Sequence, residues 1–215
     1  IFSDPGLIKY FGEGIENYAT VAGIAAAVGV MTSTQINAID SADLVVMSDE
    51  QVKSINASGI TGMTSSLMSK LTSNQIAALT TAQIKAMSTD QVKGLTTAQA
   101  ANLTQDQIKT LSTAQLDAMD TVDLAAVSTD AIAGLTATQV KSMSTANIKA
   151  LTSDQISRIG TAQVALLSAE QAQAIETVDL AAMTTAQIRA LSARNIAALE
   201  ASSQIANLTS QQVAA

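Results

Sequence analysis

Three pairs of acidic residues are the groups in this chain whose type and spacing could do chemistry. The two members of each pair lie three residues apart: Asp40/Asp43, Asp120/Asp123 and Glu176/Asp179. Paired carboxylates can act as general acid and base, or supply oxygen ligands to Ca²⁺. However, no EF-hand-type loop surrounds them, and all three pairs occupy the same two positions of a repeated unit. At those positions a helix-capping role accounts for them.

The chain lacks the residues that other kinds of catalytic site require. The 215-residue chain has no histidine and no cysteine, which excludes Ser-His-Asp triads, imidazole or thiolate metal sites, and disulfides. It has no glycine-rich phosphate-binding loop. Its net charge of −7 argues against a nucleic-acid partner, because phosphates require basic patches. We therefore predict that the protein is not an enzyme and has no catalytic, cofactor-binding or metal-binding residues.

A repeated eight-residue unit must position the acidic pairs. Twenty-one octads run without a gap over residues 31–198, followed by a nine-residue unit, 199–207, and a last octad, 208–215. The consensus is (Leu/Met)-(Ser/Thr)-(Thr/Ser/Ala)-(Ala/Asp)-Gln-(Ile/Val)-(Lys/Ala)-small. Positions 1 and 6 are apolar in all twenty-one octads. The two acidic residues of each pair stand at positions 2 and 5.

Every octad contains the signals that begin a helix. Ser or Thr at position 2 with Gln three residues later forms a capping box, and the apolar residues at positions 1 and 6 form a hydrophobic staple. A new start every eight residues forbids a long helix. A β-solenoid is disfavoured because positions 1 and 6 would lie on opposite faces of one strand. Gly59, Leu67 and Ala131 replace the usual Gln, so we expect their octads to be less firmly capped.

The fold class that satisfies this pattern is all-α, a narrow α-solenoid over residues 31–215 with one short helix of about six residues per octad. Position 6 and the next position 1 form one buried stripe, and the small residue at position 8 permits close approach at each corner. The basic residues at position 7, such as Lys109, are expected in solvent. The sequence does not determine how many octads make one superhelical turn.

Residues 1–30 lie outside the repeat and contain all four aromatic residues of the chain. Asp4-Pro5 predicts a helix over residues 5–11, and a second helix is expected over residues 15–30. The segment is either a helical cap for the first octads or a docking segment for another subunit. The longest apolar run, residues 19–31, is too short to span a bilayer.

The last octad, 208–215, has no polar cap after it, so we expect either the chain to continue or another copy to cover this end. Unlike ends that complement each other without closing a ring give filaments. The predicted partners are therefore copies of the chain itself or adjoining segments of a longer chain. The expected assembly contacts are Phe2, Tyr10, Phe11, Tyr18, Leu208 and Val213.

The phrases LTTAQIKA, MSTDQVKG, LTSDQISR and LSTAQLDA resemble the LTTAQ(I/V)xA arrays of very large secreted or surface proteins of proteobacteria, which are often adhesin-like. The resemblance covers residues 31–215 and implies an extracellular structural role without catalytic residues. The expected function is a surface filament subunit or a stalk segment of an adhesin. The alternative is a binding module that presents a repetitive solenoid surface to a polysaccharide or a protein.

Overall fold

The computed structural model describes residues 21–214, and this part consists of short α-helices and one 3₁₀ helix without any strand. The chain divides into two units, residues 1–102 and 103–215. The described helices of the first unit are α2 (Val21–Gly29), α3 (Ser33–Asn37), α4 (Ser41–Val45), α5 (Asp49–Ser54), α6 (Ala57–Gly62), α7 (Ser65–Met68), α8 (Ser73–Ala78), α9 (Thr81–Ala86), α10 (Thr89–Lys93) and α11 (Thr97–Ala101).

The second unit follows the same plan. Its described helices are α12 (Gln105–Thr110), α13 (Thr113–Asp117), α14 (Thr121–Ala126), α15 (Thr129–Ile132), α16 (Ala137–Ser142), α17 (Thr145–Ala150), α18 (Ser153–Arg158), α19 (Thr161–Val164), α20 (Ala169–Ala174), α21 (Thr177–Ala182), α22 (Thr185–Ala190), α23 (Ala193–Ala201), η2 (Gln204–Asn207) and α24 (Ser210–Val213). The prediction of one short helix per octad is thus confirmed in both units.

Local hydrogen bonds explain where each helix begins. In α16 the Thr136 Oγ1 atom accepts a hydrogen bond from the Gln139 backbone amide at 3.2 Å, and the Thr136 amide donates to Gln139 Oε1 at 2.7 Å. This is the predicted capping box. The helix ends at Met143, whose extended backbone (φ −61°, ψ 139°) turns the chain into the next octad.

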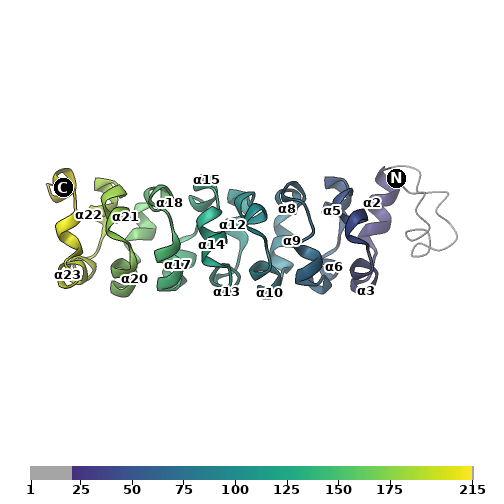
Figure 1. Cartoon of the computed structure of the whole chain (residues 1–215), viewed down its shortest axis with the longest axis horizontal. Helices are drawn as coiled ribbons and strands as arrows, with labels where there is room; N and C mark the ends of the chain where they lie inside the picture. The colour runs from purple at the N-terminus through teal and green to yellow at the C-terminus, as the bar shows by residue number, and fades with distance from the viewer. Residues whose placement is uncertain (1–20, 215) are drawn as a thin grey trace. The chain divides into compact units, whose positions relative to one another are not determined.

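Within each unit, helices pack against the third helix along the chain, so three octads make one turn. In the first unit α5 packs on α2 and α8 packs on α5; in the second, α15 packs on α12 and α18 packs on α15. Figure 1 shows the helices of each unit as successive coils. The all-α solenoid is therefore confirmed, and three octads per turn is the value that the sequence left open.

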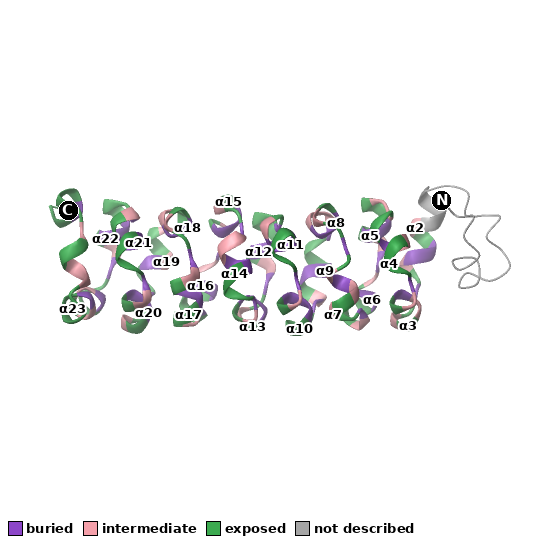
Figure 2. Cartoon of the chain, in the orientation of Figure 1, coloured by how far each residue is buried: buried purple, intermediate pink, exposed green. Residues whose placement is uncertain are grey.

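The core is an aliphatic stripe made of positions 6 and 1. Ile108, Leu111, Val140 and Met143 represent it, and each is at most 5% exposed. Figure 2 shows buried residues along the inner side of the coils and exposed residues outside. Burying one such side chain contributes about 1.5–3 kcal/mol, which short helices need because they are marginal alone. The predicted assignment of positions 1 and 6 to the core is confirmed.

Glycine at position 8 permits the close approach expected at the corners. A Cβ atom placed on Gly62 would overlap the Ser33 Cβ, and one on Gly134 would lie 2.5 Å from the Gln105 Cγ. Both contacts join position 8 to position 3 of the preceding turn. A larger side chain at either glycine would push neighbouring turns apart.

The N-terminal helix predictions are tested only in part. Helix α2 covers Val21–Gly29 and lies inside the predicted helix of residues 15–30. The predicted helix of residues 5–11 lies outside the described residues. Among the described helices, none combines the length and the apolar character that a bilayer crossing requires.

Candidate functional site

A ladder of buried glutamine amides is the most regular feature of both units. The Gln at position 5 uses its Oε1 for the capping box and turns its Nε2 toward the preceding turn. Gln139 Nε2 donates to Ile108 O at 2.8 Å and to Leu111 O at 2.7 Å, two carbonyls of that turn. The side-chain amide of one Gln therefore caps the start of its own helix through Oε1 and donates through Nε2 to two backbone carbonyls of the preceding turn.

The same arrangement recurs along both units. Two such donor bonds are made by Gln75, Gln83, Gln91, Gln99, Gln139, Gln155, Gln171, Gln187 and Gln212, each of which is buried. Each hydrogen bond contributes about 0.5–1.5 kcal/mol net, and an unpaired buried partner costs about 1–3 kcal/mol. The ladder thus specifies the register between turns as well as adding stability.

Where the side chain at position 5 is shorter than Gln, a residue at position 7 of the preceding turn can supply the missing hydrogen-bond acceptor. Asn147 is one methylene shorter than Gln, and the Ser144 amide donates instead to Asp117 Oδ1 at 3.1 Å. Asn147 Nδ2 also donates to Asp117 Oδ1 at 3.3 Å and to Leu116 O at 3.4 Å. The carboxylate therefore accepts the hydrogen bond that a Gln oxygen would accept.

Two of the three octads that we expected to be weakly capped use neighbouring amides. At the Leu67 octad the Thr64 amide donates to Asn37 Oδ1 at 2.9 Å. At the Gly59 octad, Asn56 Oδ1 accepts from the Gly59 amide at 2.8 Å, and Asn56 Nδ2 donates to Gly29 O at 2.8 Å. Both octads keep one half of the box. In the Leu67 octad Asn37 replaces the acceptor of the other half, whereas in the Gly59 octad Asn56 replaces the Gln side chain as donor to carbonyls of the preceding turn.

Ala131 departs from the consensus by removing one half of the capping box. The Ser128 Oγ accepts from the Ala131 amide at 3.3 Å, which is the half that remains. The Ala side chain has no polar atom, so it cannot supply the reciprocal acceptor. The weaker capping expected at this octad is therefore confirmed.

The acidic pairs cap their helices differently from the prediction. Asp40 and Asp120 accept from the amides two residues later, Ala42 and Val122, at 2.8 and 3.0 Å, and not from the amide three residues later. The shorter Asp side chain favours this closer amide. Glu176 makes no side-chain cap bond at all. The reciprocal capping box proposed for these pairs is therefore wrong.

Glu176 instead faces the preceding turn. Its Oε1 lies 3.6 Å from Lys149 Nζ, and Asp179 Oδ1 accepts from Ser153 Oγ at 2.5 Å. Lys149 is at position 7, as Asp117 is, so this position repeatedly contacts the N-cap of the next turn. The Lys149 and Glu176 side chains are 66% and 50% exposed, so we expect their ion pair to contribute little.

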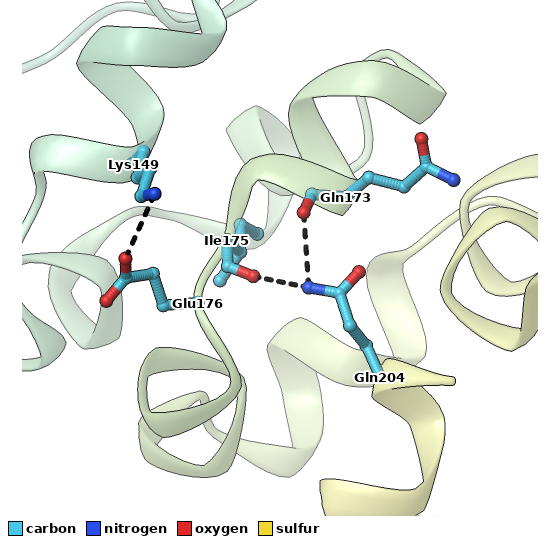
Figure 3. A network of polar contacts seen from close by, with 5 residues as sticks. All are labelled: Lys149, Gln173, Ile175, Glu176 and Gln204. Carbon is cyan, nitrogen blue, oxygen red and sulfur yellow. Dashed lines mark hydrogen bonds and ion pairs between the residues drawn. The ribbon is translucent and has the colours of Figure 1, made fainter. Parts of the chain in front are cut away.

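The nine-residue unit inserts one residue without breaking the ladder. Ser203 takes the left-handed backbone conformation (φ 61°, ψ 13°) between α23 and η2. After it, Gln204 Nε2 donates to Gln173 O at 3.1 Å and to Ile175 O at 2.7 Å (Figure 3). Gln212 reaches carbonyls one place further back along the chain than the Gln of a regular octad does. The insertion is absorbed at Ser203.

The insertion borders a shallow surface hollow of about 370 Å³ in the second unit. Its lining includes the Lys149–Glu176 ion pair, Gln173 and Gln204, which Figure 3 shows together, and the exposed Val178. A second hollow of about 350 Å³ lies beside Gly134 and Lys109. Both hollows are corners between turns, lined by polar side chains and backbone. They could contact an extended polar ligand.

Groups able to do covalent or metal chemistry do not converge in the part of the chain that the structure describes. No set of three or more acidic residues there could hold a metal ion. The pKa of Glu170 is lowered, first by a hydrogen bond from its own backbone amide and next by one from the Ser168 side chain. This is ordinary behaviour for a carboxylate in the first turn of a helix.

Of the six residues expected to make assembly contacts, the structure describes two. Leu208 is half-buried, and Val213 is 70% exposed although it holds the position that is buried in earlier octads, such as Ile188 at 7%. Phe2, Tyr10, Phe11 and Tyr18 lie outside the described residues. The buried amide ladder was missed as a whole from the sequence, where Gln at position 5 indicated only local capping.

Comparison with known proteins agrees with the repeat pattern. The model of the ALTTAQ repeat matches residues 68–105, 117–153 and 172–210, which together make up more than half of the chain. The sequence matches no curated protein. The three matched stretches lie within the octads that build the two solenoid units, and this chain belongs to the ALTTAQ repeat family.

Proposed function

We propose that this chain is an extracellular structural protein that serves as a spacer, either as a subunit of a bacterial surface filament or as a stalk segment of a large adhesin. The observation that carries the proposal is the glutamine ladder. The ladder glutamines of both units donate to the same two carbonyl positions of the turn before them. Every turn therefore presents the backbone carbonyls that the glutamines of the next turn bind, and further turns can be added with the same hydrogen bonds.

The exposed aliphatic residues of the last turn support joining to further material. Val213 is 70% exposed, and Leu208 beside it is half-buried. A further turn of octads, in the same chain or in a second copy, would cover both residues with the same aliphatic stripe. In the end-to-end version, the segment that contains Phe2, Tyr10, Phe11 and Tyr18 meets this face of a neighbouring molecule.

Electron microscopy of the purified full chain at increasing concentration tests the end-to-end version. We expect fibres, and we expect Val213→Asp to abolish them while far-ultraviolet circular dichroism stays helical. Val122→Asp is the matched control, because Val122 is 64% exposed and belongs to α14, many octads before the last turn along the chain. Deleting residues 1–18 should also abolish fibres. A chain that stays monomeric at high concentration contradicts end-to-end assembly and leaves the stalk version.

The stalk version is tested by pulling on single molecules. A ladder solenoid should open turn by turn, and each turn of three octads would release about 80 Å of extended chain. Steps of this size are the expected result. One all-or-none extension of a whole unit would contradict a cohesion that is distributed over equal turns.

A second candidate function is a binding module, and the hollow beside Lys149 favours it. This hollow lies where the nine-residue unit breaks the repeat, and it offers a lysine, two glutamine amides and an exposed valine to a ligand. A polysaccharide or an extended protein segment fits this chemistry. Binding that is lost in Gln173→Ala but kept in Gln211→Ala, a change at an exposed glutamine elsewhere in the second unit, would support this function.

A further inference from the structure

The chain contains three copies of the triplet Asn-x-Ser/Thr, whose asparagine can carry a sugar in a secreted protein. They are Asn56-Ala57-Ser58, Asn102-Leu103-Thr104 and Asn207-Leu208-Thr209. Asn102 is the last residue of the first unit, whereas each of the other two triplets lies within one unit. These two differ in how the folded chain uses the asparagine.

The Asn56 side chain is engaged by the fold. Its Oδ1 accepts from the Gly59 amide at 2.8 Å and caps α6. Its Nδ2 donates to Gly29 O at 2.8 Å and to Met31 O at 3.3 Å, two carbonyls of the preceding turn. A sugar on this half-buried Nδ2 would remove at least one of these bonds and would have to fit between two turns. Asn56 therefore has a structural role in the folded chain.

The Asn207 side chain lies on the surface at the end of η2. It is exposed, and its Nδ2 donates to Gln204 O at 3.3 Å, within the same short helix. Water can replace a hydrogen bond at such an exposed position. Leu208 follows with an extended backbone (φ −66°, ψ 141°), and the exposed Thr209 caps α24. The triplet thus forms a surface turn, which is where acceptor asparagines occur.

The corner at Asn207 also has room that other corners lack. The last place of an octad meets the preceding turn closely at Gly62 and Gly134, where an added Cβ atom would overlap a neighbour. Asn207 holds the last place of the nine-residue unit and is exposed. The Leu and Thr that follow it are the usual residues at positions 1 and 2 of the repeat. One unusual residue therefore creates an acceptor triplet at an open corner.

We infer that Asn207 is the acceptor of an N-linked sugar and that Asn56 is not. In the transfer, catalysed by a separate glycosyltransferase, Asn207 Nδ2 attacks the anomeric carbon of a hexose carried on a nucleoside diphosphate. A carbon–nitrogen bond forms, the bond from that carbon to the diphosphate oxygen breaks, the diphosphate leaves with the electron pair, and the amide loses one proton to water. The inference rests on the proposed extracellular placement but not on assembly.

Site-resolved mass spectrometry of the protein from its natural source tests the modification in the cell. We expect the peptide that contains Asn207 to carry the added mass of a sugar and the peptide that contains Asn56 to be unmodified. An unmodified Asn207 would overturn the inference. Cell fractionation and electron microscopy score location and fibres separately, so this site and the proposed function can each fail alone.

A transferase reaction on the purified, folded full chain tests the part that the fold plays. The reagents are a transferase specific for Asn-x-Ser/Thr and a nucleoside-diphosphate hexose. Every variant carries Asn102→Gln and Ser58→Thr, which leaves two triplets of one type. We expect Asn207 to be modified about tenfold or more above Asn56, because Asn56 must first give up two hydrogen bonds to the preceding turn. Thr209→Asp should abolish modification of Asn207 while it keeps an N-cap on α24.

Peptides of residues 52–62 and 203–213, with the same Ser58→Thr change, are the controls without the fold. They should be modified to a similar extent. Equal modification of Asn56 and Asn207 in the folded chain would overturn the inference. A difference between the peptides as large as in the folded chain would also overturn it, because the local sequence and not the fold would then select the site. Sugar that remains on Asn207 in Thr209→Asp would contradict recognition of the triplet.

Discussion

Asp117 lies one solenoid turn before Asn147 and accepts a hydrogen bond from its side chain, with 3.3 Å between Asp117 Oδ1 and Asn147 Nδ2. The same oxygen accepts from the Ser144 amide at 3.1 Å. Two departures from the consensus, an acid at position 7 and an Asn at position 5, thus explain each other. They are distant in the sequence and stand in octads that become neighbours only in the folded chain.

The Asp117–Asn147 pair predicts a rescue. Asp117→Ala leaves the Ser144 amide without its acceptor and should lower the free energy of unfolding by about 1–2 kcal/mol. Adding Asn147→Gln should restore most of this loss, because Gln oxygen reaches its own N-cap amide in other octads. Urea denaturation of the double-mutant cycle measures the coupling. Asp106→Ala, at an exposed acid in the same unit, is the control and should change stability little. Equal losses from Asp117→Ala in both backgrounds would contradict the pairing.

Asn195 is also an Asn at position 5, but no neighbouring carboxylate compensates for its shorter side chain. Its Oδ1 is the one buried side-chain atom without a hydrogen-bond partner among the described residues, and its Nδ2 reaches Leu167 O at 3.2 Å. Ala165 stands where Asp117 would stand. Asn195→Gln should therefore raise the free energy of unfolding by about 1 kcal/mol, because it completes the capping box and the ladder. Thermal denaturation checks this. A loss of stability would mean that the pocket cannot accommodate the longer amide.

The ladder itself is tested by an apolar side chain of similar length. Gln139→Met removes the acceptor of the Thr136 amide and the donor to Ile108 O and Leu111 O. Two buried carbonyls and one half-buried amide lose a partner, so we expect a loss of about 3 kcal/mol or more. Gln211→Met, at an exposed glutamine, should change stability by no more than about 0.5 kcal/mol. Chemical denaturation of both variants decides. Similarly small losses of stability in both variants would mean that the ladder hydrogen bonds contribute little to stability.

Ser203 predicts a stabilising substitution. Its left-handed backbone (φ 61°) costs a non-glycine residue about 1 kcal/mol, so Ser203→Gly should raise stability by about 0.5–1 kcal/mol. The neighbouring Ser202 has φ −92° and donates from Oγ to Leu199 O at 3.1 Å. Ser202→Gly should therefore destabilise, and opposite signs for adjacent serines are the expected thermal-denaturation result.

Neighbouring residues on opposite faces of α12 test the core. Ile108 is fully buried at position 6, and Lys109 is exposed at position 7. Ile108→Asp buries an unpaired charge and should cost about 4 kcal/mol or prevent local folding. Lys109→Ala should change the free energy of unfolding by no more than about 0.5 kcal/mol. Amide hydrogen exchange of α12 distinguishes the two, and equal effects would contradict the assigned faces.

The sequence by itself determined the short helices, their starting points and their buried face. These features depend on hydrogen bonds and apolar contacts between residues close together in the chain, such as Thr136 with Gln139, and local spacing in the sequence specifies them. For the same reason the acidic residues at position 2 were placed correctly at helix N-termini. The prediction of which backbone amide donates to each of these carboxylates was wrong, because the donor depends on side-chain length and on contacts with the preceding turn.

The tertiary structure decided that three octads make one turn, and with it the second role of Gln139 and its equivalents. The turn size is the sum of small rotations at every corner, set by residues such as Met143, and no single octad encodes that sum. The acceptors of the Gln139 amide belong to the preceding turn, so they are its neighbours only once the turn has closed. The same non-local closure pairs Asp117 with Asn147, a relation that no local pattern in either octad could indicate.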